Sequence, residues 1–187
     1  MMRWRNSKDR YGIIAQGFHW LVAALVLAQL ALGLYAADLP LSLARLQWLS
    51  RHKALGLGVL ALVLLRLGWR TLDRAPALPG SMPVWERRAA LATHRLLYAL
   101  LVLAALAGWL YASAAGLSVD WFGLFRVPDL VAKNAQLAML FKQAHKALVA
   151  LLALLLLVHV GAALRHAWLT RDGVMHRMLP WHPAGRR

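Results

Sequence analysis

The segment FKQAHKALVALLALLLLVHVGAALRHAW, residues 141–168, decides the fold of this chain. It consists largely of Ala, Leu and Val, yet it contains His145, His159 and His166. An imidazole in hydrocarbon leaves polar nitrogens without partners, so histidines inside such a helix indicate a function. Fourteen residues of α-helix rise about 21 Å and return to within about 40° of the same face. His145 and His159 therefore share a face at two depths, and His166 returns to that face seven residues later.

The composition of the chain points to a membrane. Hydrophobic residues make up 61% of the sequence, yet the formal net charge is +15. A nucleic-acid-binding domain would explain the charge but not the apolar content, because the basic residues lie between long apolar runs rather than along one exposed stripe. The sequence has no cysteine, which excludes disulfides, iron–sulfur clusters and thiolate metal sites. A membrane protein without a nucleic-acid partner accounts for all of these features.

Four apolar stretches are long enough to cross a bilayer, which takes roughly 20 residues each. They lie near residues 12–36, 50–69, 90–112 and 144–168. We therefore expect an all-α membrane protein in which residues 1–187 form a single domain, a bundle of four transmembrane helices. The first stretch follows a basic start, but its apolar run is too long for a signal peptide and no convincing cleavage site follows, so we expect it to be retained.

The connections between these stretches differ in composition. The second, around DRAPALPGSMPVWERR (residues 73–88), contains three prolines and a glycine and predicts a short non-helical crossing. The third, residues 113–143, contains WFGLF and the amphipathic LVAKNAQLAMLFKQ, which predicts a short helix lying in the membrane interface. Thirteen Lys and Arg residues flank the side of the two termini and seven flank the other side. This bias predicts that both termini lie in the cytoplasm.

Four histidines fall into two pairs of equal depth. His19 in the first stretch and His159 in the fourth lie at matching inner depth, whereas His52 in the second and His145 in the fourth lie at matching outer depth. Two such pairs, about 20 Å apart in one bundle, match the requirement for bis-histidine ligation of two haems. Arg66 lies fourteen residues after His52 and returns to its face at the inner depth, where it could neutralise a haem propionate.

The same histidines are compatible with two roles besides haem ligation. A single membrane histidine is about as often a helix-to-helix hydrogen bonder as a ligand, although four in two level pairs are harder to account for in that way. A histidine-based metal transporter is a minor alternative, because such proteins usually place carboxylates in the membrane. Here all seven acidic residues lie in expected loops or tails.

The sequence resembles a known family, the bacterial cytochrome b561 proteins, which are four-helix di-haem b proteins of the bacterial inner membrane. The resemblance covers nearly the whole chain and rests on FHW (18–20), RHKALG (51–56), ERRAALATHRLLY (86–98), WFGLF (121–125), HKAL to HVGAALRH (145–166) and RDGVMHRMLP (171–180). It implies two haem b groups, with His19 and His159 as axial ligands of the inner haem iron and His52 and His145 as those of the outer. Many members end the fourth helix with paired histidines, whereas here Ala167 follows His166.

Two stacked haems would carry single electrons between the faces of the membrane. On the inner side the expected acceptor is a quinone, ubiquinone in the resembling family. We expect His166, Arg87 and Arg88 to bind it, because a histidine and a cation at a haem edge can bind a quinone carbonyl and deliver protons. His94 is predicted with equal weight to hold a haem propionate or to take part in the quinone site.

The outer side is predicted to steer an anion. Lys53 and Lys146 follow the outer ligands directly, and Arg51 adds to their field. A positive rim concentrates a small anion, and some proteins resembling this sequence oxidise superoxide and pass the electron to ubiquinone. Lysines that only contact lipid headgroups would look the same in sequence. The main alternative is a cytochrome b subunit whose outer surface docks a redox partner protein, a dehydrogenase or hydrogenase.

Overall fold

The structure, a computed structural model, describes residues 3–179. Four long helices follow one another: α1 (Ile13–Asp38), α2 (Leu43–Leu72), α3 (Val84–Ala114) and α4 (Ala135–Arg165). The π-helical turn η1 (His166–Thr170) and the 3-10 turn η2 (Met175–Met178) follow α4. Between α3 and α4, strands β1 (Asp120–Trp121) and β2 (Phe125–Arg126) form an antiparallel hairpin.

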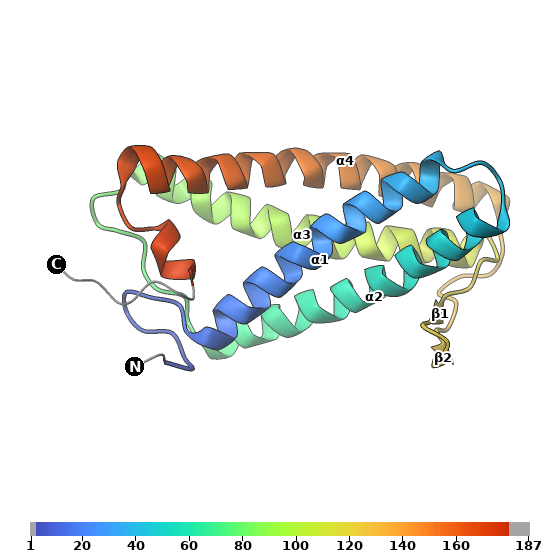
Figure 1. The fold of residues 1–187 in the computed structure, drawn as a ribbon, viewed down its shortest axis with the longest axis horizontal. Helices are drawn as coiled ribbons and strands as arrows, with labels where there is room; N and C mark the ends of the chain where they lie inside the picture. The colour runs from blue at the N-terminus through green and yellow to red at the C-terminus, as the bar shows by residue number, and fades with distance from the viewer. Residues whose placement is uncertain (1–2, 180–187) are drawn as a thin grey trace.

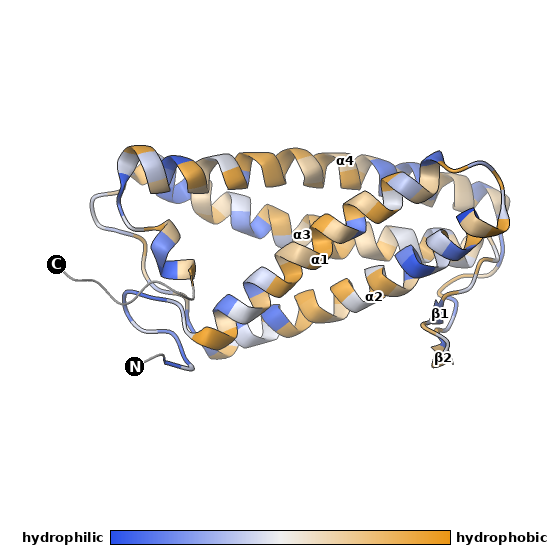
Figure 2. Cartoon of the chain, in the orientation of Figure 1, coloured by the Kyte–Doolittle hydropathy of each residue, from blue (hydrophilic) through white to orange (hydrophobic). Residues whose placement is uncertain are grey.

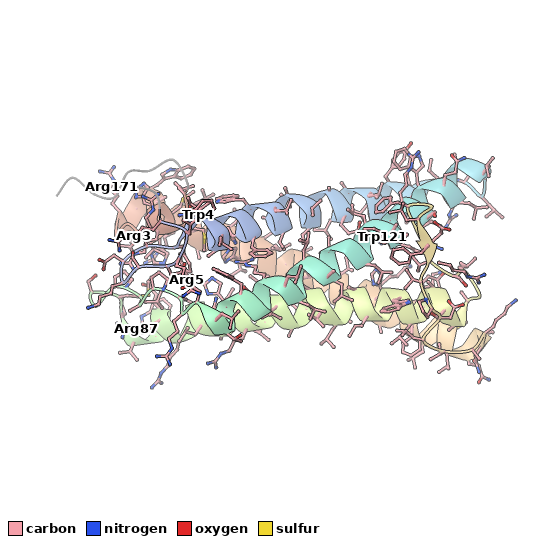
Figure 3. The ribbon with its side chains drawn as sticks, turned by 90° about the horizontal axis from the view of Figure 1, so that it is seen from below. Arg3, Trp4, Arg5, Arg87, Trp121 and Arg171 are labelled. Atoms are coloured by element: carbon pink, nitrogen blue, oxygen red, sulfur yellow. The ribbon has the colours of Figure 1, made fainter. Side chains whose placement is uncertain are left out.

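The helices form one elongated bundle with two distinct ends (Figure 1). The start of α1, the α2–α3 connection and the turns after α4 lie at one end, which we name the termini end. The α1–α2 connection and the β-hairpin lie at the other, the hairpin end. In Figure 3 the labelled Arg3, Arg5, Arg87 and Arg171 gather at the termini end, whereas Trp121 lies at the hairpin end.

All four helices are long and apolar enough to cross a membrane. Their middle parts are predominantly hydrophobic and polar residues concentrate toward the two ends (Figure 2). Large apolar side chains are exposed along the helices, such as Leu34 (74%), Leu65 (60%) and Leu157 (72%). In water such surfaces would favour aggregation, but lipid tails solvate them as well as a protein core does. The predicted four-helix membrane bundle is confirmed.

Small and branched side chains fill the interior of the bundle. α1 packs chiefly against α2, and α3 chiefly against α4. Val22 and Val26 of α1 meet Val59 and Val63 of α2 in one buried cluster. A second cluster joins Leu97 and Leu100 of α3 to Leu152 of α4. Because lipid is as apolar as these side chains, no hydrophobic effect drives the helices together, and close van der Waals packing holds the pairs instead.

The helices are longer than the apolar stretches, and one prediction for the third connection is wrong. Residues 135–143, expected in a separate interfacial helix, form the first turns of α4. Asn134 explains this start: its side-chain oxygen accepts hydrogen bonds from the backbone N–H groups of Gln136 and Leu137, which is an N-cap. No glycine or proline separates this cap from the apolar segment, so the helix continues. The second connection is non-helical over residues 73–83, as predicted, whereas residues 84–88 belong to the start of α3.

The C-terminal turns fold back onto the start of α1. The guanidinium of Arg10 donates to the carbonyl of Leu179 at 2.6 Å, and the indole of Trp20 donates to the carbonyl of Met178 at 2.9 Å. The amide of the buried Gln16 donates to the carbonyl of Arg177 at 3.2 Å. These bonds tie the chain after α4 to the helix that carries His19.

Candidate functional site

The structure brings together both histidine pairs that were predicted from depth. At the termini end, the rings of His19 (α1) and His159 (α4) lie with centroids 6.3 Å apart and planes inclined at 72°. At the hairpin end, the rings of His52 (α2) and His145 (α4) lie 6.2 Å apart at 83°. Fourteen residues of α4 separate His145 from His159, which is about 21 Å of helix rise.

These spacings can be compared with what one metal ion would require. Two imidazoles on opposite sides of a metal, with metal–nitrogen bonds of about 2 Å and each ring centre about 1.1 Å beyond its nitrogen, have centroids roughly 6.3 Å apart. Both pairs have this separation. The donor set, two neutral nitrogens without a carboxylate, is the set that holds a low-spin haem iron. The residues present therefore fit a haem at each end.

At the hairpin end the rings pack directly against backbone. A Cβ added at Gly33 would lie 2.8 Å from Cε1 of His52, and one added at Gly108 would lie 3.1 Å from both Cε1 and Nδ1 of His145. Nδ1 of His145 lies 2.8 Å from the carbonyl oxygen of Ala104. A carbonyl only accepts, so Nδ1 of His145 carries the hydrogen and Nε2 keeps its lone pair, the arrangement typical of metal-bound histidine.

Sequence reasoning missed these two glycines. Other glycines near the histidines do not approach them in this way: a Cβ at Gly17, Gly58 or Gly161 would meet no atom within 4 Å. A usable signal was present: Gly33 lies fourteen residues after His19 and Gly108 fourteen after His94. The same fourteen-residue spacing separates His145 from His159 on α4. On α1 and on α3 it places a glycine at the height of the hairpin-end pair.

The other histidine of the hairpin-end pair, His52, has an incomplete set of hydrogen bonds. Nδ1 of His52 is buried without a hydrogen-bond partner among the described residues. Gln29, from α1, donates its amide to the carbonyl of His52 at 2.7 Å, and its amide oxygen is likewise buried and unpartnered in the described part of the chain. Sequence reasoning did not single out Gln29, because one polar residue in an apolar helix carries no positional signal.

At the termini end, side chains surround the pair instead of backbone. A terminal nitrogen of Arg66 lies 3.0 Å from Nδ1 of His19, and the ring of His94 lies 5.5 Å from that of His159. Guanidinium only donates, so Nδ1 of His19 accepts and its hydrogen sits on Nε2 when the ring is neutral. To bind iron through Nε2, His19 would need the opposite tautomer, and Arg66 would have to move away from Nδ1.

Arg66 has an aromatic neighbour besides His19. Its guanidinium carbon lies 5.3 Å from the ring centre of Tyr98, and that of Arg70 lies 5.9 Å from the same ring. Each is within the range of a cation–π contact. Two cations therefore lie beside the termini-end pair, where an acidic group of a cofactor would find a partner.

His166 stands where α4 ends, and it is held by the chain that follows. Its Nδ1 lies 2.6 Å from a carboxylate oxygen of Asp172. Arg165 forms an ion pair at 2.5 Å with Glu86, which places the start of α3 beside the end of α4. Arg87 and Arg88, predicted to join His166, thus lie at the same end of the bundle; Arg87 donates to the carbonyl of Pro79 at 3.2 Å.

The predicted steering cations differ in their surroundings. The ammonium of Lys53 donates to the carbonyls of Leu117 at 2.8 Å and Ser118 at 3.1 Å, so it is anchored at the base of the hairpin. The guanidinium of Arg51 stacks over the ring of Trp48 at 4.5 Å. Lys146 is exposed. All three lie at the hairpin end, beside the His52–His145 pair.

A free metal ion fits the chain less well than haem does. Among residues 3–179 there is no group of three or more His, Cys, Asp or Glu side chains that could hold a metal ion. The histidines instead meet in pairs, and each pair would supply two nitrogen ligands to a haem iron.

Comparison with known proteins gives consistent matches. The family model described as "Prokaryotic cytochrome b561" matches residues 10–181, which include all four helices. "Cytochrome b561 homolog 2" of Escherichia coli (strain K12) is 32% identical over 183 residues, covering 95% of this chain and 95% of its own length. "Cytochrome b561 homolog 1" of the same organism is 29% identical over 129 residues, covering 69% of this chain and 73% of its own.

Proposed function

This chain belongs to the prokaryotic cytochrome b561 family, and on that premise we propose that it oxidises superoxide at the hairpin end and reduces ubiquinone. As a member of the family it is a multi-pass inner-membrane protein that binds haem b and transfers electrons across the membrane. The number of haems, their ligands, the substrates and the orientation are part of the proposal. So is the organisation of residues 1–187 as one transmembrane cytochrome domain.

The observation that carries the proposal is the presence of two equivalent histidine pairs along α4. His52 and His145 would hold one haem at the hairpin end, and His19 and His159 would hold the other at the termini end. When bound, the two haems supply one-electron redox chemistry at both ends of the bundle. Two histidines on each haem would leave no free ligand position on the iron, so the substrates would exchange electrons from sites beside the histidine pairs.

The orientation follows from the basic residues. The termini end carries more Lys and Arg than the hairpin end, so we place it in the cytoplasm and the hairpin end in the periplasm. Figure 3 supports this placement, since the labelled arginines lie at the termini end. The hairpin end would then meet electron donors outside the cytoplasm.

The hairpin end suits a small anionic donor. Lys53 directly follows His52, and its ammonium donates to the carbonyls of Leu117 and Ser118. These two bonds hold its positive charge in place. Lys146 follows His145 and is exposed, and Arg51 precedes His52. A positive rim at a low-dielectric mouth raises the local concentration of an anion and its rate of encounter. Superoxide is a singly charged anion that only has to give up one electron.

The termini end suits a quinone. His166 lies at the end of α4, and Arg87 and Arg88 begin α3 beside it. A histidine and cations can bind the carbonyl oxygens of a quinone and supply protons as they become reduced. His94 is close to His159 and would support either the quinone or a haem propionate, while Arg66, once released from His19, would neutralise a propionate.

The overall reaction balances with one quinone for two superoxide ions. Each superoxide loses one electron and becomes dioxygen. Ubiquinone gains these two electrons and two protons and becomes ubiquinol. The chain thus joins a one-electron donor to a two-electron acceptor.

Stopped-flow mixing of the isolated oxidised protein with superoxide tests the donor. We expect fast haem reduction without a partner protein, slowed by salt, because screening shortens the reach of the lysine field to about 8 Å at physiological ionic strength. Replacing Lys53 and Lys146 with Gln is expected to slow reduction and flatten its salt dependence at unchanged haem content. Lys8→Gln, an exposed lysine at the termini end, is the matched control and is expected to change neither.

The alternative, a cytochrome b subunit of a dehydrogenase or hydrogenase, gives a different result in the same experiment. It expects slow, salt-insensitive reduction by superoxide, and fast reduction only with the partner enzyme present. That outcome would refute the superoxide assignment and leave the di-haem electron carrier in place.

A further inference from the structure

A histidine–carboxylate pair closes the termini end beyond α4. Nδ1 of His166 lies 2.6 Å from Oδ2 of Asp172, and only 12% of the His166 side chain and 20% of the Asp172 side chain are exposed. The other carboxylate oxygen of Asp172 accepts the backbone N–H of Val174 at 3.1 Å. The hydroxyl of Thr170 donates to the carbonyl of His166 and lies 3.3 Å from its Nδ1. Both oxygens of the carboxylate are thus held, and the imidazole is held with them.

The local backbone explains how residues six apart come together. The α-helix changes at His166 into the π-helical turn η1, a wider turn that is frequent at functional sites. Arg171 then adopts the left-handed conformation (φ 50°) and Gly173 follows at φ 77°, so the chain reverses direction within three residues. The reversal carries Asp172 back toward the helix end. A straight continuation of α4 would separate residues 166 and 172 by about 9 Å of rise.

The contact fixes the form of the imidazole. An ionised carboxylate only accepts, so Nδ1 of His166 carries a hydrogen and Nε2 is left for another partner. Burial opposes ionisation of Asp172, but the hydrogen bonds from Val174 and His166 outweigh it and hold the pKa of Asp172 below its ordinary value. A ring that carries hydrogens on both nitrogens can give up the one on Nε2 and keep its hydrogen bond to Asp172 through Nδ1.

We infer that Asp172 is a positioning residue of the quinone site, which holds His166 with Nε2 as the atom that gives a proton to the reduced quinone. The inference rests on the proposed reduction of ubiquinone at the termini end. Of the two protons that the quinone takes up, one leaves Nε2 of His166, while Nδ1 keeps its hydrogen, and forms the O–H bond of one quinol oxygen; the other comes from water and forms the second O–H bond. The two electrons come from the transfer activity of the chain. Water then returns the proton to His166 at this partly exposed turn.

The charged residues next to His166 and Asp172 in sequence have other partners, so Asp172 is the residue that holds His166. Arg165 is paired with Glu86, and Arg171 donates to the carbonyl of Trp168 at 3.2 Å. Glu86 is therefore a matched control: it is a carboxylate at the same end, bound to the residue directly before His166, and it belongs to a different contact. A loss of helix-end structure would affect Glu86→Gln and Asp172→Asn alike, whereas loss of the proton donor would affect Asp172→Asn alone.

The experiment uses the full-length protein with haem bound and reduced, mixed with a short-chain ubiquinone in H2O and in D2O. Haem re-oxidation is followed by absorbance, and binding of the oxidised quinone is measured separately by calorimetry. We expect Asp172→Asn to slow re-oxidation by about tenfold to a hundredfold. Its solvent isotope effect should exceed that of the unchanged protein, while quinone affinity and haem content stay the same. Asp172→Glu should restore most of the rate, and Glu86→Gln should leave it unchanged.

Each contrary outcome has a distinct meaning. Re-oxidation of Asp172→Asn at the original rate and isotope effect would overturn the inference. So would equal slowing by Glu86→Gln, since it would show that the contact only shapes the helix end. If quinone does not re-oxidise the unchanged protein, the proposed function itself has the wrong acceptor.

Discussion

The two ends of the bundle hold similar histidine pairs by different means. At the hairpin end the rings lie against backbone: Gly33 and Gly108 leave the space for them, and the carbonyl of Ala104 fixes the tautomer of His145. At the termini end the rings lie among other side chains, with Arg66 on His19 and His94 beside His159. The separations agree to 0.1 Å, but the surroundings do not.

The neighbouring groups select different tautomers of the histidines, and only one of these tautomers leaves Nε2 free to bind iron. A backbone carbonyl on Nδ1 leaves the lone pair of Nε2 available, so the His145 side of the hairpin-end pair needs no rearrangement. A guanidinium on Nδ1 of His19 selects the opposite tautomer, so the termini-end pair could bind iron only after Arg66 moves away. A pair shaped by backbone is rigid, and a pair shaped by long side chains can be adjusted by them.

The largest expected effect comes from removing a ligand at one end. His52→Ala or His145→Ala should lose the hairpin-end haem, and His159→Ala the termini-end haem, because bis-histidine binding fails when one imidazole is missing. The measurement is the haem-to-protein ratio, which should fall from two to one in each variant. A ratio that stays at two would show that the pairs are assigned wrongly.

Filling the space at a backbone-shaped pair should come next. In Gly33→Ala the new Cβ would lie 2.8 Å from Cε1 of His52, so the ring must shift. Overpacking of this kind costs about 1–3 kcal/mol, which is roughly fivefold to more than a hundredfold in affinity. Haem titration of the purified protein should show weaker binding at the hairpin end alone.

Gly17→Ala is the control for that substitution. It lies in the same helix, near the other pair, and its added Cβ would meet no atom within 4 Å. It should leave both haems bound with unchanged affinity. Equal weakening by both variants would mean that helix α1, rather than the close approach at Gly33, controls haem binding.

A smaller effect is expected where side chains adjust the pair. Arg66→Gln removes a positive charge beside the termini-end haem, which favours the oxidised iron and lowers its midpoint potential. The shift should be tens of millivolts, since about 59 mV corresponds to a tenfold change in a one-electron equilibrium. A redox titration followed at both haems measures it. A change confined to the hairpin-end haem would contradict the proposed place of Arg66.

The smallest effect on haem content is expected at His94. His94→Ala should retain both haems, because the ring of His94 is 5.5 Å from that of His159, closer than two histidines on opposite sides of one metal ion would stand. Haem stoichiometry measures this as well. Loss of one haem would make His94 the partner of His159 in place of His19.

Much of the fold followed from local features of the sequence. Apolar runs of about 20 residues in lipid form helices because every backbone hydrogen bond must be made within the segment. Helix rise then converts residue number into depth, which is why His19 could be matched with His159 and His52 with His145. The start of α4 was misplaced because an N-cap at Asn134 outweighed the change in composition near residue 144.

The sequence by itself determined the four helices and the depth of each histidine, because both depend on residues within a single helix. Tertiary structure decided what surrounds each ring: Gly33 and Gly108 against the hairpin-end pair, Arg66 against His19, and Asp172 folded back on His166. Helix rise gives the height of a residue but not the side of the neighbouring helix that it meets. That side is set by how the helices pack against one another, and the reversal after α4 is set by two left-handed backbone positions.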